Sequence, residues 1–252
     1  MSTDITIGFG EVGSALHEVL SERRPFAIVD PAKGYKPELG DAPQSDWMHV
    51  AIPYSESFIS TVVEYVRKFN PSHLVLHSTV PIGTTRKIER EADYIPTFYS
   101  PVRGRHPNLS AALRRFPKYF ASSISGQMDD EFVIYFANAG IQTRKAPSFE
   151  VLEYAKLMET TTFGIILTAW MEMETQVSKM HGDKQTNLSM LKNFLFEKRK
   201  VYDGDIGIFP VLDLVRGPIG GHCISSNYEL LKDSMTPELY AWLMTSNSLR
   251  KE

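Results

Sequence analysis

The segment Ile5-Thr6-Ile7-Gly8-Phe9-Gly10-Glu11-Val12-Gly13 decides the fold of this chain. A short apolar strand pattern runs directly into G-x-G-x-x-G, and residues 14–21 follow with an apolar face that indicates a helix. A second strand pattern, at residues 26–30, ends in Asp30. About 30 residues thus contain, in order, a strand, a glycine turn, a helix, a second strand and an acid. This is the arrangement of a dinucleotide-binding unit.

Each glycine of this turn has a physical task. Gly8 permits the tight turn, Gly10 lets a pyrophosphate approach the backbone, and Gly13 lets the helix pack on the strand. The pyrophosphate would meet free N–H groups at the start of the helix. Asp30 would accept hydrogen bonds from the adenosine ribose and repel a 2′-phosphate, so NAD is expected rather than NADP, although Lys33 could weaken that preference. The expected cofactor contacts of the turn are Gly8, Phe9, Gly10, Glu11, Val12 and Gly13. The alternative is a tight turn in a fold that binds no cofactor.

Strand and helix patterns alternate beyond this unit. Strand patterns cover residues 47–52, 74–77, 94–98, 118–123 and 141–145, and helix patterns cover residues 57–69, 84–91 and 130–139. This alternation predicts a Rossmann-type, doubly wound and mostly parallel α/β sheet over residues 1–147. Ligands of such sheets bind beyond the carboxyl ends of the strands, where Pro53, Ser78 and Thr79 fall.

Residues 148–252 are predicted to form a long connecting helix and a small all-helical domain for substrate binding and dimerisation. Residues 149–180 contain no proline and indicate one helix, about 45 Å long at roughly 1.5 Å per residue. Further helices are predicted at residues 188–197 and 237–247. A helix of this length needs two neighbours or a second subunit to cover it, so a homodimer is expected.

The composition is that of an ordinary globular protein. The 27 basic and 30 acidic residues give a net charge of −3, which creates no general attraction to nucleic acid or to an anionic membrane. No apolar run approaches the roughly 20 residues of a membrane span, and no signal-peptide pattern opens the chain, so a cytoplasmic location is expected. One cysteine cannot form an internal disulfide, and the seven histidines show no metal-ligand spacing, so no metal is expected.

Two further stretches resemble the UDP-glucose/GDP-mannose dehydrogenase family. Residues 77–85, His-Ser-Thr-Val-Pro-Ile-Gly-Thr-Thr, resemble its S-T-V-P-x-G-T-T turn, whose threonine lies near cofactor and substrate. Residues 217–224, Gly-Pro-Ile-Gly-Gly-His-Cys-Ile, resemble its active-site G-x-x-G-G-x-C motif, nearest to the branch that acts on UDP-N-acetylmannosamine. Lys156 matches the lysine on the family's long central helix. With the glycine turn, these matches follow the family's order along the chain.

This resemblance implies a chemistry. Family members oxidise a primary alcohol of a sugar nucleotide to a carboxylate with two NAD, and their cysteine captures the aldehyde as a thiohemiacetal that is oxidised to a thioester and hydrolysed. The catalytic positions are Cys223, Lys156, Thr79, Thr160 and Asn227. The candidate substrate contacts are Gly220, Gly221 and His222 beside the cysteine, and Arg103 and Arg105 in a local basic cluster.

The chain departs from the family pattern at several of these positions. Thr160 stands in place of an asparagine, and Asn227 in place of an acid. Val102 stands where many members have a glutamate that assists thioester hydrolysis. Neither Asn227 nor Val102 can act as a base at neutral pH, so thioester hydrolysis is expected to be impaired. The family's nucleotide-binding third domain is not expected within this sequence, so a separate chain could supply it, the substrate could be smaller, or activity could have been lost.

We therefore predict an NAD-dependent oxidoreductase acting on a hydroxyl group of a sugar nucleotide or a related small polar substrate, with Cys223 and Lys156 in the site. Two alternatives stay open: an NAD-binding, non-catalytic or regulatory homologue, and a two-electron β-hydroxyacid-type dehydrogenase. Taken alone, a free cysteine is more often a small buried apolar group, and a helix lysine or a basic cluster is more often a solvated surface. The expected partners are a small-molecule substrate and a second copy of the chain, with no nucleic acid and no membrane.

Overall fold

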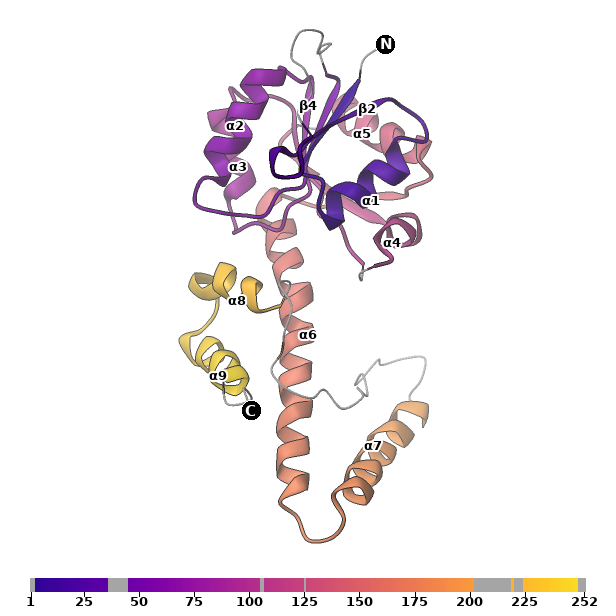
Figure 1. Cartoon of the computed structure of the whole chain (residues 1–252), viewed down its shortest axis with the longest axis vertical. Coiled ribbons are helices and arrows are strands. Elements are labelled where there is room, and N and C mark those ends of the chain that lie inside the picture. The colour runs from indigo at the N-terminus through magenta and orange to yellow at the C-terminus, as the bar shows by residue number, and fades with distance from the viewer. Residues whose placement is uncertain are drawn as a thin grey trace. The chain divides into compact units, whose positions relative to one another are not determined.

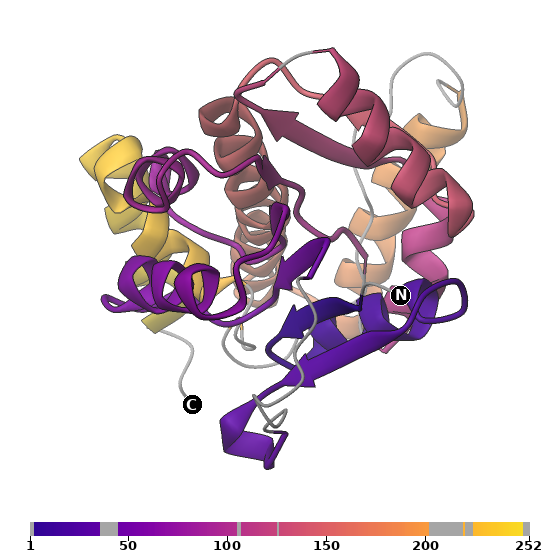
Figure 2. The same cartoon turned by 90° about the horizontal axis from the view of Figure 1, so that it is seen from above.

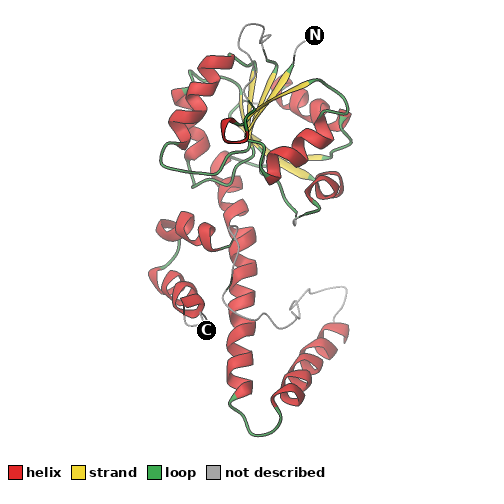
Figure 3. Ribbon diagram, viewed as in Figure 1, coloured by secondary structure: helices red, strands yellow, loops and turns green. Residues whose placement is uncertain are grey.

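The computed structural model describes residues 3–35, 45–104, 107–124, 126–201, 219 and 224–248, with residues 196–201 described by their backbone alone. The chain divides into two compact units, Met1–Lys156 and Leu157–Glu252. The first unit is a sheet flanked by helices and the second is helical (Figure 3). The long helix α6 (Phe149–Ser178) contributes to both units.

Within the described part of the first unit, seven strands form one sheet in the order β2-β1-β3-β4-β5-β6-β7. The strands are β1 (Asp4–Ile7), β2 (Phe26–Val29), β3 (Trp47–Val50), β4 (His73–Leu76), β5 (Thr97–Tyr99), β6 (Lys118–Ser122) and β7 (Thr143–Lys145). Only the pair of β5 and β6 is antiparallel. The strand order reverses between β1 and β3, which places the topological switch point beside the glycine turn. The predicted mostly parallel, doubly wound sheet is confirmed.

Helices cover both faces of this sheet (Figures 1 and 2). The helices α2 (Phe58–Phe69) and α3 (Thr84–Glu91) pack on one face, together with the first turns of α6. The helices α1 (Glu11–Leu20), α4 (Leu109–Arg115) and α5 (Gln127–Asn138) pack on the other face. This arrangement follows from the alternation of strand and helix patterns, because each parallel crossover places its helix on a face of the sheet.

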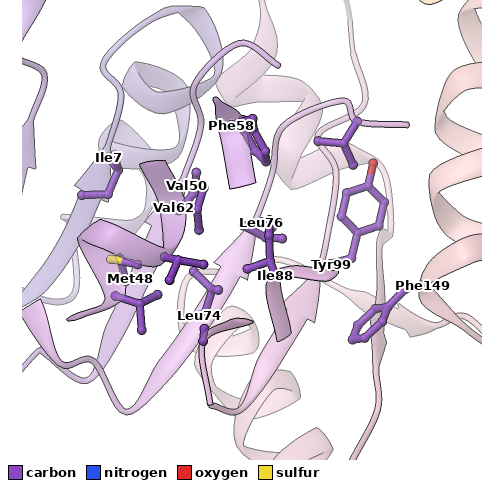
Figure 4. Packing of buried hydrophobic residues seen from close by; sticks show 14 of the residues in the cluster. Ile7, Met48, Val50, Phe58, Val62, Leu74, Leu76, Ile88, Tyr99 and Phe149 are labelled. Carbon is purple, nitrogen blue, oxygen red and sulfur yellow. The ribbon is translucent and has the colours of Figure 1, made fainter. Parts of the chain in front are cut away.

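The central strands are buried on both faces. Leu74 and Leu76 point into the core beneath α2 and α3, where Phe58 and Ile88 meet them (Figure 4). Val75 lies between them in the sequence and joins the second core, on the face of α1 and α5. Strands covered on both sides are continuous apolar runs rather than alternating ones, and β4 has that character.

The second unit contains the rest of α6, followed by α7 (Lys184–Val201), α8 (Ser225–Leu231) and α9 (Pro237–Ser248). Gly164 allows α8 to approach α6 closely, because a Cβ at Gly164 would lie 1.9 Å from Tyr228 Oη. Burial raises the pKa of Tyr228 to about 12, so its phenol stays neutral. No described helix of either unit is both long and apolar enough to span a membrane.

The structure differs locally from the sequence-based expectation at four elements. The strand expected over residues 94–98 begins only at Thr97, because Asp93 and Tyr94 have φ values of 54° and 57° and cannot be extended there. Helix α7 begins at Lys184, four residues early, because the Asp183 carboxylate accepts the Thr186 N–H at 2.8 Å and caps the helix. The two short helices α4 and α8, of seven residues each, are not predicted by the sequence.

Candidate functional site

The glycine turn connects β1 to α1. Gly8 has a φ of +89°, and a Cβ there would lie 2.6 Å from the carbonyl oxygen of Ala51. A Cβ at Gly13 would lie 2.0 Å from the carbonyl oxygen of Gly8. Both contacts are with backbone atoms, which cannot move aside as a flexible side chain can. The packing of the turn against β3 and α1 therefore requires these two glycines.

Gly10 is different. Among the described residues outside its own chain neighbours, no atom lies within 4 Å of the position that its Cβ would occupy. Its φ of −76° and ψ of −159° are accessible to any residue, and the residue is exposed. The protein itself thus gives no reason for a glycine at this position. The open space at the amino end of α1 fits the close approach of a pyrophosphate, as a dinucleotide requires.

Asp30 lies directly after β2 and beside the same turn. Its Oδ2 accepts the Phe9 N–H at 2.8 Å, and Lys33 Nζ donates to the Phe9 carbonyl oxygen at 2.7 Å. The Phe9 peptide is therefore held from both sides. Among the described residues, no donor contacts Asp30 Oδ1, which is thus available to a ribose hydroxyl. The ammonium of Lys33 binds the turn itself.

The other predicted cofactor contacts lie at the carboxyl edge of the sheet. Pro53 follows β3, and Ser78 and Thr79 follow the neighbouring strand β4. Ser78 Oγ donates to the Ile52 carbonyl oxygen at 2.6 Å and so ties the two strand ends together. Thr79 is half-buried and Pro53 is exposed. The structure brings these residues to the edge of the sheet at which the glycine turn also lies.

Glu153 is a positioning residue that the sequence does not single out. Its fully buried carboxylate accepts the Gly83 N–H at 2.6 Å and the Thr85 N–H at 2.8 Å, and thereby caps the amino end of α3. Burial raises the pKa of Glu153, although these hydrogen bonds act in the opposite direction. Lys156 is half-buried and lies three residues further along α6. Glu153 therefore anchors the turn of α6 that carries Lys156 to the segment that contains Thr79.

Lys118 is a second residue that the sequence does not reveal. It opens β6 at the carboxyl edge of β5, is 4% exposed, and donates through Nζ to the Ser100 carbonyl oxygen at 2.8 Å and to the Pro101 carbonyl oxygen at 3.3 Å. No described carboxylate pairs with it. Burial and then the positive charge of Lys156 hold the pKa of Lys118 well below its ordinary value. A buried lysine without an acidic partner is rare outside functional sites.

In the second unit, Thr160 and Asn227 are direct neighbours. Asn227 is buried in α8, and its Nδ2 donates to Thr160 Oγ1. The Thr160 hydroxyl in turn donates to the Leu157 carbonyl oxygen at 3.1 Å. Two positions at which the chain departs from the family pattern therefore form one hydrogen-bonded pair.

Cys223, Gly220, Gly221 and His222 lie outside the described residues. The two isoleucines that flank them are described. Ile219 and Ile224 pack with Leu167 and Met171 of α6. Asn247 of α9 also binds Ile219, through Oδ1 to its N–H at 2.6 Å and through Nδ2 to its carbonyl oxygen at 3.3 Å. Both flanks of the cysteine motif are thus anchored to helices of the second unit.

The basic cluster is described in part. Arg105 lies outside the described residues, and the Arg103 guanidinium stacks over the Phe116 ring at 5.6 Å. Arg114 is engaged with Glu22 at 2.7 Å. Val102 is buried in the core beneath α4. Over the part of the chain that the structure describes, no three His, Cys, Asp or Glu side chains are grouped so that they could hold a metal ion.

Comparison with known proteins shows similarity to solved dehydrogenase structures at low sequence identity. A UDP-D-ManNAc dehydrogenase from Pyrococcus horikoshii has a TM-score of 0.76 at 13% identity, over 98% of this chain and 68% of that chain. A 3-hydroxyisobutyrate dehydrogenase from Mycobacterium tuberculosis has a TM-score of 0.71 at 14% identity, over 99% of this chain and 94% of that chain. A UDP-glucose dehydrogenase from Pyrobaculum islandicum has a TM-score of 0.71 at 12% identity, over 99% of this chain and 68% of that chain.

No family model and no curated protein matches the chain. The chain therefore shares the fold of UDP-sugar and 3-hydroxyisobutyrate dehydrogenases, and it spans 68% of the length of the two UDP-sugar enzymes named above. The resemblance inferred from the glycine turn and the S-T-V-P segment is confirmed at the level of the fold.

Proposed function

We propose that this chain is an NAD-dependent oxidoreductase that acts on a hydroxyl group of a sugar nucleotide or a related small polar substrate. The observation that carries the proposal is the open space at Gly10, in a turn whose other two glycines are required by backbone packing. Asp30 supports it, because none of the described residues donates to one of its carboxylate oxygens, which lies beside this turn and could accept from a ribose hydroxyl. The dehydrogenase fold of the similar structures supports it further.

In this proposal, each residue has a task in the reaction. The chemistry that bound NAD supplies is the acceptance of a hydride from the carbon that bears the substrate hydroxyl. The backbone around Gly10 binds the pyrophosphate, and Asp30 binds the adenosine ribose and favours NAD over NADP. Lys156 stabilises the negative charge that develops on the substrate oxygen, or accepts its proton. Cys223 captures an aldehyde when oxidation proceeds to a second stage.

We further propose that hydrolysis of a thioester at Cys223 is slow. Two side chains support this view. Val102 is apolar and packed in the core, and Asn227 is an amide whose NH₂ group donates to Thr160. Neither can activate water as a general base.

The second candidate is a two-electron β-hydroxyacid-type dehydrogenase, in which Lys156 serves a single exchange of alcohol and carbonyl. The extent of the similarity to the 3-hydroxyisobutyrate dehydrogenase favours it, because the match covers 94% of that enzyme. In this candidate Cys223 has no role in turnover. A third candidate is a homologue that binds NAD without turnover and is therefore not an enzyme.

We also propose a cytoplasmic location and a separate chain that supplies a nucleotide-binding domain. We further propose that the chain forms a homodimer through α6. Exposed large apolar side chains on α6 support the dimer: Val151 is 51% exposed, Tyr154 43% and Phe163 46%. Val151 and Tyr154 are three residues apart and share one face of the helix, and an exposed apolar face of this kind is commonly covered by a partner. Light scattering that finds a monomer at micromolar concentration would exclude the dimer.

The proposal is tested by NADH formation with a panel of sugar nucleotides and small β-hydroxyacids. We expect turnover with at least one class, and its loss in Lys156→Ala but not in Lys179→Ala, an exposed lysine beyond the end of α6. One NADH per substrate molecule, unaffected by Cys223→Ser, would favour the β-hydroxyacid candidate. NAD binding without turnover across the panel would favour the non-catalytic homologue.

A further inference from the structure

A row of buried polar side chains crosses the sheet of the first unit. Asp4 opens β1, His49 lies within β3, His77 follows β4, and Tyr135 reaches in from α5. Their exposed fractions are 0%, 0%, 2% and 8%. Buried polar groups of this kind must find hydrogen-bond partners, because each unsatisfied one costs free energy. None of the four has a task in the function proposed above.

The contacts along this row are continuous. Tyr135 Oη lies 2.9 Å from Asp4 Oδ2 and 2.9 Å from His49 Nε2. His49 Nδ1 lies 3.0 Å from His77 Nε2, and His77 Nδ1 lies 2.6 Å from the Ser100 carbonyl oxygen. The row therefore leads from the amino end of β1 to the carboxyl end of β5.

The Ser100 carbonyl fixes the direction of every hydrogen bond. A carbonyl oxygen only accepts, so His77 Nδ1 carries the proton and neutral His77 accepts at Nε2. His49 Nδ1 must then donate to His77, which makes Nε2 of a neutral His49 an acceptor. The hydroxyl of Tyr135 faces that nitrogen and donates its proton to it.

Tyr135 has only one proton to donate. Once its hydroxyl donates to His49, its contact with Asp4 is a hydrogen bond only if the Asp4 carboxyl is protonated and donates to Tyr135 Oη. If Asp4 is ionised and both histidines are neutral, the Tyr135 hydroxyl can donate either to the carboxylate or to His49 Nε2. At the other contact its oxygen then faces a second acceptor, without a proton between them. A complete set of hydrogen bonds therefore needs one proton beyond those of the neutral rings, the phenol and an ionised carboxylate.

The charges around the histidines disfavour placing that proton on an imidazole. The positive charge of Lys118 acts on both rings, and that of Arg24 acts on His49 as well. Burial and then these positive charges lower the pKa of His49 to about 3 and hold the pKa of His77 well below its ordinary value.

The surroundings of Asp4 favour the protonated carboxyl. Arg24 Nη1 lies 3.6 Å from Asp4 Oδ2, the Trp47 N–H donates to Oδ1 at 3.2 Å, and Asp46 lies nearby. Burial outweighs Arg24 and the hydrogen bonds and raises the pKa of Asp4 to about 6. Arg24, Trp47 and Tyr135, which contact the carboxyl, also line a pocket of about 750 Å³ at the amino end of the strands.

We propose that Asp4, Tyr135, His49 and His77 form a single proton-binding site, with the proton on Asp4 and its exchange with solvent through the amino-edge pocket. When Asp4 releases the proton to water, the Tyr135 hydroxyl turns from His49 to the carboxylate, and His49 Nε2 loses its donor. The state of a carboxyl at the amino edge of the sheet then changes the hydrogen bonding of His49 within the sheet, and His49 in turn donates to His77. This inference does not depend on the proposed enzymatic function.

The test is a pH titration of the histidine rings by two-bond ¹H–¹⁵N correlation spectra of the ¹⁵N-labelled full chain. We expect His49 and His77 to be neutral Nδ1–H tautomers, and the His49 Nε2 resonance to move in one step with a midpoint near pH 6. Asp4→Asn, which keeps a neutral donor at the same place, should abolish the step. Asp46→Asn should keep the step and move its midpoint to lower pH, because Asp46 raises the pKa of Asp4.

Several results would overturn the proposal. An Nε2–H tautomer of either ring, or a positively charged His49 in this pH range, would show that the proton is not on Asp4, and both are read from the wild-type chain alone. A step that persists in Asp4→Asn would assign it to another group. If Asp4→Asn does not fold, Tyr135→Phe provides the same discrimination, because it should remove the step from His49 while the carboxyl still titrates.

Discussion

Two alanine substitutions test why the turn needs its glycines. We expect Gly10→Ala to affect mainly ligand binding and Gly13→Ala to affect mainly folding. In Gly13→Ala, the new methyl would lie 2.0 Å from the Gly8 carbonyl oxygen, where ordinary contacts are 3.4–4 Å. The backbone must therefore move by more than about 1 Å, and overpacking of this kind costs about 3 kcal/mol at the upper end of the usual range. Alanine recovers about 1 kcal/mol through its higher helix propensity, which leaves a loss of about 2 kcal/mol.

The methyl of Gly10→Ala meets no atom within 4 Å in the described part of the chain, and the residue keeps an accessible backbone conformation. Alanine is a poorer helix cap than glycine by about 0.5–1 kcal/mol, and the smaller entropy of the unfolded chain returns a similar amount. We therefore expect the free energy of unfolding to change by less than about 0.5 kcal/mol. The added methyl occupies the space proposed for the pyrophosphate, and we expect at least a tenfold loss of NAD affinity, or about 1.4 kcal/mol.

Urea unfolding and calorimetric titration with NAD measure the two quantities on the same samples. We expect Gly10→Ala to keep the wild-type free energy of unfolding but to bind NAD poorly, and we expect Gly13→Ala to lose stability. Wild-type NAD affinity in Gly10→Ala would refute the assignment of that space to the cofactor. Wild-type stability in Gly13→Ala would refute the steric argument.

Three further predictions concern stability and reactivity. The folded chain holds the Asp4 proton more tightly than the unfolded chain, because the pKa of Asp4 is raised from 3.8 to about 6. The unfolding free energy of the wild type should therefore fall by about 3 kcal/mol relative to Asp4→Asn as pH rises from about 3 to 7, and parallel curves from urea unfolding would contradict this. Glu153→Gln should lose about 1–3 kcal/mol in the same assay, because an amide has one acceptor oxygen and leaves one of the two buried N–H groups unpaired. Glu150→Gln at the half-exposed pair with Arg86 should lose less than about 1 kcal/mol, and equal losses would argue against the cap. Alkylation of Cys223 against pH should show a thiol pKa below about 8.5, and slow labelling with an unperturbed pKa would argue against a nucleophile.

The sheet domain could be predicted because its signals are local. The glycine turn, the acid after β2 and the apolar run of β4 each lie within a few residues of one another. The uninterrupted pattern of α6 is equally local, and the helix over Phe149–Ser178 is confirmed. Short elements carry too few residues for a clear period, so α4 and α8 are not apparent from the sequence.

The residues that the sequence does not reveal depend on contacts between distant segments. Glu153 caps a helix that lies 68 residues earlier in the chain at Thr85, and His49 meets Tyr135 across 86 residues. Lys118 begins an otherwise ordinary strand, and only the fold shows that its ammonium is buried against backbone carbonyls. No pattern of spacing or composition signals such pairings, because each partner alone has the appearance of a surface polar residue.

Calorimetric titration of the wild-type chain with NAD and with NADP tests the central claim most directly. We expect that NAD binds and that NADP binds more weakly, because in the proposed binding mode the carboxylate of Asp30 accepts from the adenosine ribose and would repel a 2′-phosphate. Failure to bind NAD, or an affinity for NADP that equals or exceeds that for NAD, would contradict it.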